Sequence, residues 1–163
     1  MTVNTPGRRN KRPLLTAEEL RTWREFIETA EALRTELASR LQNESGLSAG
    51  DYAVLLALSE APGRRLRSSD LAANIGWERS RLSHHLGRME RRGLIRREEC
   101  GADGRGAEVV LETSGAEAFR RASVPHLRAV RELFVDALTP AELAAAGEVT
   151  KALRARLDSS RAT

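Results

Sequence analysis

The sequence has a single cysteine, few aromatic residues and no long apolar run. Because Cys100 has no second cysteine to pair with, an intramolecular disulfide is excluded, which agrees with a reducing compartment. No stretch of about 18 apolar residues is present to cross a membrane, and the polar N-terminus does not match a signal peptide. We therefore expect a cytoplasmic protein with no membrane partner.

Catalytic and metal-binding patterns are also lacking. No acid/base pair, nucleophile arrangement or metal-ligand cluster occurs at a recognisable spacing, so we expect no enzyme activity, no metal and no cofactor. The neighbours His84 and His85 are poorly suited to share a metal ion, because adjacent side chains on a helix point about 100° apart. Lysine occurs only at Lys11 and Lys151, so arginine carries almost all of the positive charge.

The size and composition of the chain are those of one globular domain, but its charge is unevenly distributed. Of the 163 residues, 40% are hydrophobic and 31% are charged. Residues 1–13 carry four basic residues and no acid, and residues 64–105 carry eleven arginines against six acids, whereas the remainder is acidic. We interpret residues 1–13 as a flexible basic arm before a single domain over residues 14–163. No basic segment has a large apolar face, so nucleic acid is favoured over a membrane surface as the partner.

Long helices are predicted at both ends of this domain, over about residues 16–44 and 113–158. Two capping boxes, each a threonine with a glutamate three residues later, mark helix starts: Thr16 with Glu19, and Thr139 with Glu142. Pro125 is expected to kink or interrupt the helix that contains it. The first helix carries more apolar surface than one face of a small domain normally covers, so it requires a second partner.

Residues 47–112 have the pattern of a winged helix-turn-helix. The stretch "SSDLAANIG" predicts a short helix that is capped near Ser68 or Ser69 and ends at Gly76, and a second helix follows after two or three residues. Short extended segments then flank "GADGRG", whose glycines and aspartate are typical of a hairpin tip. The predicted fold is mainly α with a small β-hairpin wing, a winged helix-turn-helix flanked by N- and C-terminal helices.

The second helix of this pair, "ERSRLSHHLGRMERRGLI", has two unlike faces. Leu82, Leu86 and Met89 form a narrow apolar stripe. The opposite face is basic and polar, and Gly87 leaves bare backbone there, which suits a helix that must approach base edges in the major groove of DNA. We expect Arg81 to contact guanine. The predicted DNA-binding residues are Ser69 in the first helix and Arg79, Ser80, Arg81, Ser83, His84, His85, Arg88 and Arg91 in the second, with Arg88 and Arg91 on phosphates.

Two wing residues complete the predicted interface. Arg105 at the tip can enter the minor groove, and Asp103 holds the turn or orients Arg105 through an ion pair. The alternative is that the arginine-rich helix is only a solvated surface and that "DG" is only a hairpin turn. The position of the helix, second in a helix-turn-helix and directly before a hairpin, favours DNA binding.

These segments, together with "CGADGRGAEVVLETSG", resemble the MarR family of bacterial winged-helix transcriptional regulators. The likeness includes "RMERRGLI" and the Asp-x-Arg wing pattern, and "TWREF" and "LTPAELAA" extend it to the family's dimerisation helices. It implies a homodimer whose N- and C-terminal dimerisation helices interlock, with one winged helix per subunit on palindromic double-stranded DNA. It also implies a repressor rather than an activator, released from DNA by a small-molecule effector.

The resemblance further implies a site for small aromatic or phenolic anions beside the dimerisation helices. The residues that could build it are Trp23, Arg24, Phe26, Tyr52 and His126. Equally, the two aromatic residues of the first helix could be core, Arg24 solvated and His126 structural. A rival function is a ligand- or redox-sensing module whose winged helix contacts protein. Cys100 would be its thiol, although the lack of a resolving cysteine favours a bystander.

Overall fold

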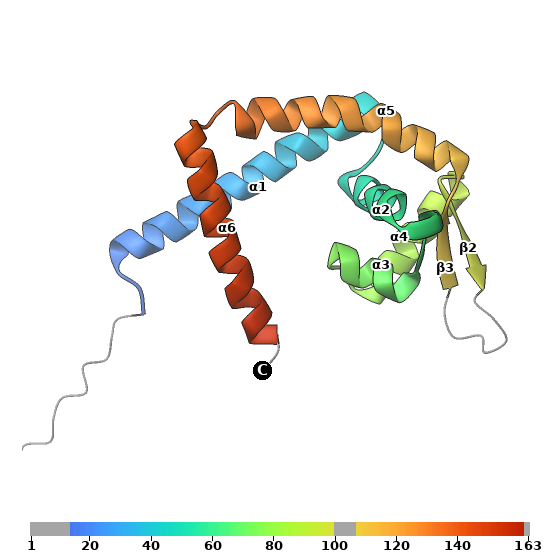
Figure 1. Cartoon of the computed structure of the whole chain (residues 1–163), viewed down its shortest axis with the longest axis horizontal. Coiled ribbons are helices and arrows are strands. Elements are labelled where there is room, and N and C mark those ends of the chain that lie inside the picture. The colour runs from blue at the N-terminus through green and yellow to red at the C-terminus, as the bar shows by residue number, and fades with distance from the viewer. Residues whose placement is uncertain (1–13, 100–106, 162–163) are drawn as a thin grey trace, which may run out of the picture. The chain divides into compact units, whose positions relative to one another are not determined.

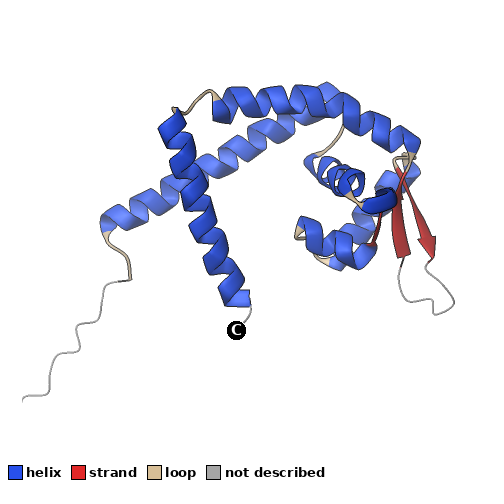
Figure 2. Ribbon diagram, viewed as in Figure 1, coloured by secondary structure: helices blue, strands red, loops and turns tan. Residues whose placement is uncertain are grey.

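The computed structural model describes residues 14–99 and 107–161, which form helices and one small sheet (Figures 1 and 2). The chain divides into two compact units, residues 1–35 and residues 36–163. Helix α1 (Ala17–Ser45) begins in the first unit and ends in the second. In the described ranges, none of the helices combines the length and the apolar character needed to span a membrane.

Helix α1 begins at the predicted capping box. The backbone N–H of Thr16 donates to Oε2 of Glu19 at 2.7 Å, and the backbone N–H of Glu19 donates to Oγ1 of Thr16 at 3.1 Å, which confirms this start. The apolar stripe that follows is largely uncovered, since Trp23 is 56% exposed and Phe26 is 48% exposed. Among the described residues, none covers these two aromatic side chains, whereas Leu41 near the end of the same helix is buried in the core.

The second unit contains a winged helix-turn-helix. Its elements, in chain order, are α2 (Ala49–Glu60), β1 (Arg65–Arg67), α3 (Ser68–Ile75), α4 (Arg79–Arg91), β2 (Ile95–Glu99), β3 (Ala107–Leu111) and α5 (Thr113–Val130). Helix α2 starts at a second kind of capping box, Ser48 with Asp51. Leucines from the helices and Ile95 and Val109 from the strands are almost fully buried in one core. Burying each such side chain contributes roughly 1.5–3 kcal/mol, which fixes α4 against the rest of the unit.

The predicted hairpin is part of a three-stranded antiparallel sheet in the order β1-β3-β2 (Figure 2). Ile95 lies opposite Leu111 in the β2–β3 pair, and Arg65 lies opposite Val110 in the β1–β3 pair. Strand β1 is only three residues long, too short to show an alternating pattern, so the sequence did not predict it. It joins the start of α3 to the wing.

One predicted detail of the helices is wrong, and another is wrong in part. Neither serine caps α3, because the N-cap residue is Arg67 and Oγ of Ser68 instead donates to the backbone oxygen of Ala107 in β3 at 2.9 Å. Of the kink or interruption expected at Pro125, the interruption does not occur, because α5 continues through the proline to Val130, where a π-helical segment, η2 (Arg131–Val135), follows. The burial of Ala122 and Ala129 on either side of the proline provides packing that offsets the lost backbone hydrogen bond.

The last helix, α6 (Pro140–Arg161), starts as the sequence predicted. The backbone N–H of Thr139 donates to Oε2 of Glu142 at 2.8 Å, and the backbone N–H of Glu142 donates to Oγ1 of Thr139 at 3.3 Å. Its apolar residues Val149, Leu153 and Leu157 are 50%, 47% and 59% exposed. Like the first part of α1, this helix has an apolar stripe that no part of residues 14–99 and 107–161 covers.

Candidate DNA interface

Helix α4 is held by its apolar stripe, as predicted. Leu82, Leu86 and Met89 are at most 1% exposed, so the opposite face of α4 is fixed toward the surface. The helix ends at Arg91 with Arg92 as its C-cap, and Gly93 turns the chain with a positive φ of 70°. The predicted DNA-binding side chains found exposed are Ser69, Arg79, Ser80, Arg81, Ser83, His84, Arg88 and Arg91.

The positive charge on this face is not neutralised. Among the described residues, four of its arginines form no ion pair with a carboxylate: Arg79, Arg81, Arg88 and Arg91. Strand β2 differs, because Arg97 pairs with Glu90 at 2.6 Å and Arg96 pairs with Glu112 at 2.7 Å. The hydrogen bond from Arg97 lowers the pKa of the Glu90 carboxyl, so Glu90 stays ionised and engaged with Arg97. The face of α4 is therefore available to a polyanion.

Gly87 makes an opening in the middle of the same face. A Cβ atom added there would meet only Nη1 of Arg91, at 3.8 Å. The backbone of α4 can thus approach a flat or concave partner more closely at this point than at its other exposed positions, as major-groove binding requires.

A hollow of about 570 Å³ adjoins the first half of α4. It brings together three predicted residues from two helices, Ser69, Arg79 and Ser83. Arg67 before α3 and Arg97 in β2 also line it, and the sequence analysis did not single these two out. The signal that could have found them is their position, one directly before the helix-turn-helix and the other in the first wing strand. Leu82, Leu86 and Ala107 line the rest of the hollow, and Arg97 is already paired with Glu90, so Arg67, Arg79 and the serine hydroxyls are the donors that could bind a phosphate group.

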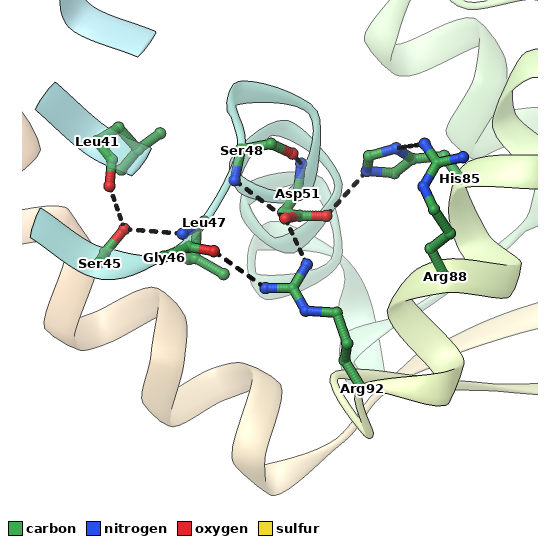
Figure 3. Close-up of polar contacts among 9 residues, drawn as sticks. All are labelled: Leu41, Ser45, Gly46, Leu47, Ser48, Asp51, His85, Arg88 and Arg92. Atoms are coloured by element: carbon green, nitrogen blue, oxygen red, sulfur yellow. Dashed lines mark hydrogen bonds and ion pairs between the residues drawn. The ribbon is translucent and has the colours of Figure 1, made fainter. Parts of the chain in front are cut away.

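His85, which the sequence grouped with the DNA-facing residues, is buried at 7% exposed and cannot offer DNA a surface. Its Nε2 lies 3.0 Å from Oδ1 of Asp51, although the direction is not that of a well-formed hydrogen bond. Nη2 of Arg88 donates to its Nδ1 at 2.9 Å. Figure 3 shows Asp51 at the centre of this group, between Arg92 and His85. The buried face of α4 thus includes His85 as well as the apolar stripe, and His85 contacts Asp51 of α2.

Asp51 joins the N-terminus of α2 to the C-terminal end of α4. Its Oδ2 accepts from Nη1 of Arg92 at 2.7 Å and from the backbone N–H of Ser48 at 3.0 Å (Figure 3). Burial works to raise the pKa of the Asp51 carboxyl, but these hydrogen bonds outweigh it and hold the pKa below its ordinary value. Burial lowers the pKa of His85 against the opposing attraction of Asp51, so the ring is neutral near pH 7.

The residues predicted to bind an effector fall into both units. Trp23, Arg24 and Phe26 are exposed on α1. Tyr52 and His126 meet in the second unit, where their ring centroids are 4.6 Å apart. Nδ1 of His126 is buried and has no hydrogen-bond partner in the described ranges, and burial lowers the pKa of this ring.

Phe119 of α5 was missed by the sequence analysis and lies 5.1 Å from Tyr52 between ring centroids. The hydroxyl of Tyr52 also makes a 3.3 Å hydrogen bond to Oγ of Ser123. Within residues 14–99 and 107–161, no group of three or more His, Cys, Asp and Glu side chains is placed to hold a metal ion. Cys100, Asp103 and Arg105 lie outside the described residues, as does the basic arm of residues 1–13.

Comparisons with known proteins match this architecture. The MarR family model matches residues 45–106. AbsC, a MarR family transcriptional regulator from Streptomyces coelicolor, is 39% identical over 93% of this chain and 100% of its own, with a TM-score of 0.83. Sco3205 from the same organism, solved in complex with DNA, is 39% identical over 89% of this chain and 91% of its own, also with a TM-score of 0.83.

PcaV, a transcriptional regulator from Streptomyces coelicolor solved with its natural ligand, is more distant. It is 26% identical over 77% of this chain and 89% of its own, with a TM-score of 0.65. The curated proteins that were compared give no match. On its identity to AbsC over nearly the whole of both chains, the chain belongs to the MarR family of transcriptional regulators.

Proposed function

We propose that this protein is a dimeric repressor that binds palindromic double-stranded DNA with α4 in the major groove. The observation that carries the proposal is the exposed face of α4, where four arginines without carboxylate partners among the described residues flank the opening at Gly87. A helix of this kind neutralises phosphates and reaches base edges at once. The DNA complex of Sco3205, at 39% identity, supports the same use here.

The residues of this face divide into two roles by position. Arg81 lies in the first half of α4, the end that enters the groove, and is the residue we assign to guanine. Arg88 and Arg91 lie in the second half and are assigned to phosphates. The hollow beside Ser69 and Arg79 is assigned to a further phosphate, because hydroxyl and guanidinium donors converge there.

The exposed apolar stripes of α1 and α6 support the proposal of a dimer. The apolar residues exposed on α1 and α6 form stripes of the kind that a second chain covers in a stable dimer. A dimer with a twofold axis would read a palindrome, and its two α4 helices would have to lie about 34–36 Å apart, one turn of DNA, to enter successive major grooves. Dimerisation is thus part of the proposed DNA-binding function.

A small ligand is proposed to weaken DNA binding. Tyr52 and His126 are in ring contact, and the buried Nδ1 of His126 has no hydrogen-bond partner among the described residues, so an aromatic anion could use both. PcaV, which has a natural ligand, is a more distant relative that supports this assignment. Release of DNA by a panel of phenolic carboxylates, with His126→Leu as the variant expected to respond less, tests it.

The decisive experiment is selection of DNA fragments from a random pool by the purified protein, followed by titration of the selected fragment. We expect a palindrome whose binding weakens steeply between low and physiological salt, because counterions are released. Arg81→Ala should weaken specific binding by about 1–3 kcal/mol and relax the sequence preference. Arg34→Ala is the matched control, since it removes the same charge from α1, where Arg34 is paired with Glu31.

Two results would contradict the proposal. The first is no binding to any double-stranded fragment even in dilute buffer. The second is equal binding of the selected fragment by the wild-type protein and Arg81→Ala, which would remove α4 from the interface.

A further inference from the structure

Trp77 lies in the turn between α3 and α4, and its neighbours hold its side chain in one position. Gly76 ends α3 in the left-handed region, with φ of 67°, and the backbone N–H of Trp77 donates to the oxygen of Ala72 at 2.9 Å. The indole is half-buried and packs against the core of the winged helix. The turn thus places the indole of Trp77 next to the start of α4.

The indole is wedged between α2 and α4. A Cβ atom added to Gly50 of α2 would lie 2.7 Å from Cη2 of Trp77 and 2.9 Å from Cε1 of His85, so only glycine leaves room for both rings. The two rings meet edge to face, with centroids 5.1 Å apart and planes at 88°. His85 is in turn placed by Asp51 and Arg88 (Figure 3). Every neighbour that fixes the indole is therefore itself buried or hydrogen-bonded.

Arg81 lies over the face of the indole. The Cζ atom of Arg81 lies 4.2 Å from the centroid of the Trp77 ring, the geometry of a cation–π contact. A contact of this kind at an exposed site favours one arrangement of the arginine by about two- to fivefold over the others. Among the described arginines of α4, Arg81 is the one that stacks on an aromatic ring.

We propose that Trp77 is a specificity-determining positioning residue, which holds the guanidinium of Arg81 in place before DNA arrives. The proposal rests on the DNA-binding function proposed above. A free arginine side chain loses much rotamer freedom when it binds, and ordering it beforehand removes part of that penalty. A guanidinium held in one direction can also donate to fewer kinds of base, because the bidentate contact to guanine depends on the angle of approach.

A double-mutant cycle tests the proposal on DNA. Dissociation constants are measured for the selected fragment and for an unrelated duplex, with Trp77→Leu, Trp77→Phe, Arg81→Ala and the double variants. Trp77→Leu should lower the ratio of specific to non-specific affinity about two- to fivefold, and Trp77→Phe should lower it less, since a smaller ring still stacks. In the Arg81→Ala background, Trp77→Leu should change this ratio less than twofold, because no guanidinium remains to position.

A measurement without DNA keeps the proposal open to refutation if Trp77→Leu folds poorly. In a Trp23→Phe parent, the remaining tryptophan emission comes from Trp77. Arg81→Ala should change that emission in the free protein, because the cation leaves the face of the indole. Arg79→Ala, which removes an exposed arginine two residues earlier, should leave the emission as it is in the parent.

The outcomes separate this proposal from the function on which it rests. If the wild-type protein binds no duplex, the proposed function fails and this role for Trp77 fails with it. If the wild-type protein binds specifically but Trp77→Leu weakens both duplexes alike, or acts equally without Arg81, the function stands and the positioning role is overturned. Unchanged emission in Arg81→Ala would also overturn it.

Discussion

Helix α4 and helix α6 differ in the burial of their apolar side chains. In α4, Leu82 and Met89 are at most 1% exposed, whereas in α6 Leu153 and Leu157 are 47% and 59% exposed. Both helices have a row of apolar residues at helical spacing, so periodicity alone does not distinguish them. The difference lies in what the chain supplies to cover each row.

The winged helix is complete within one chain, because α2, α3, α5 and the sheet close its core. The apolar stripes of α1 and α6 lack such a cover among the described residues, and exposed stripes of this kind mark interaction surfaces. From this contrast we expect the winged helix to be stabilised by its own fold, and the stripes of α1 and α6 to be stabilised by association with a second chain. Each of the following substitutions probes one side of that contrast.

The largest effect is expected for Leu153→Glu in α6. If the stripe of Val149, Leu153 and Leu157 is covered by a second copy, this change loses a buried leucine and places a charge in the interface, at about 3 kcal/mol for each chain. Analytical ultracentrifugation should show the dimer replaced by monomer at micromolar concentration. Lys151→Glu, on the opposite side of α6, is the matched control and should keep the dimer. A dimer that persists in Leu153→Glu would mean that the stripe serves another purpose.

A pair of glycine substitutions compares the two regions directly. A Cβ atom at Gly115 in α5 would collide with the backbone oxygen of Leu94, whereas at Gly147 in α6 it would meet nothing within 4 Å. Gly115→Ala should lower the free energy of unfolding by roughly 3 kcal/mol, because backbone must move. Gly147→Ala should raise it by about 0.5–1 kcal/mol, because alanine favours the helix.

Urea denaturation at one fixed protein concentration measures both variants, since the stability of a dimer depends on concentration. A tolerated Gly115→Ala would mean that α5 is less tightly seated on the wing than the structure describes. A destabilising Gly147→Ala would sharpen the comparison instead, because it would show that a second chain approaches α6 closely at that glycine.

Local patterns in the sequence were sufficient for the elements that depend on near neighbours. The capping boxes at Thr16 and Thr139 involve residues three apart, and the structure forms both. The apolar stripe of α4 likewise follows from helical spacing, and its exposed face was therefore placed correctly apart from His85. The family resemblance gave the order of helices and wing over most of the chain.

The features that the sequence did not reveal depend on residues far apart in the chain. Strand β1 exists because Arg65 pairs with Val110, and three residues alone carry no signal for it. The burial of His85 depends on Asp51 in another helix, which the sequence reading did not single out. The assignments of Asp103 and Arg105 remain predictions, since they lie outside the described residues.

The buried His85 makes the stability of the winged helix depend on pH. Because burial lowers the pKa of His85 in the folded protein, the unfolded chain takes up a proton at higher pH than the folded protein does. Its stabilising contribution is therefore full above the ordinary pKa, about 6.5, and is lost as the pH falls from there through the lowered value. The slope from this residue is at most about 1.4 kcal/mol per pH unit.

Urea denaturation between pH 5 and 7.5 measures this slope. His85→Gln, which keeps a polar side chain but does not titrate, should flatten it, whereas His84→Gln at the exposed neighbouring position should not. A slope that is the same in the wild-type protein and His85→Gln would show that other groups govern the acid sensitivity, His126 among them, since burial lowers its pKa too.

The smallest effect concerns two helix caps that have the same chemistry in the two regions. The hydroxyl of Ser48 accepts from the partly buried N–H of Asp51 at 3.1 Å, and the hydroxyl of Thr139 accepts from the exposed N–H of Glu142 at 3.3 Å. Removal of the Ser48 hydroxyl leaves a partly buried donor without a partner, whereas water replaces that of Thr139. Ser48→Ala should therefore lower the free energy of unfolding by about 1.5 kcal/mol and Thr139→Ala by about 0.5 kcal/mol.

Glycine variants at both positions separate the cap from the backbone, since glycine retains most of the capping preference and should lose only a few tenths of a kcal/mol. Equal losses for Ser48→Ala and Thr139→Ala would contradict the contrast between the regions, because they would mean that both caps are covered to the same degree. If the free energy of unfolding lost in Thr139→Ala grows with protein concentration, a second chain covers this cap, since only association depends on concentration.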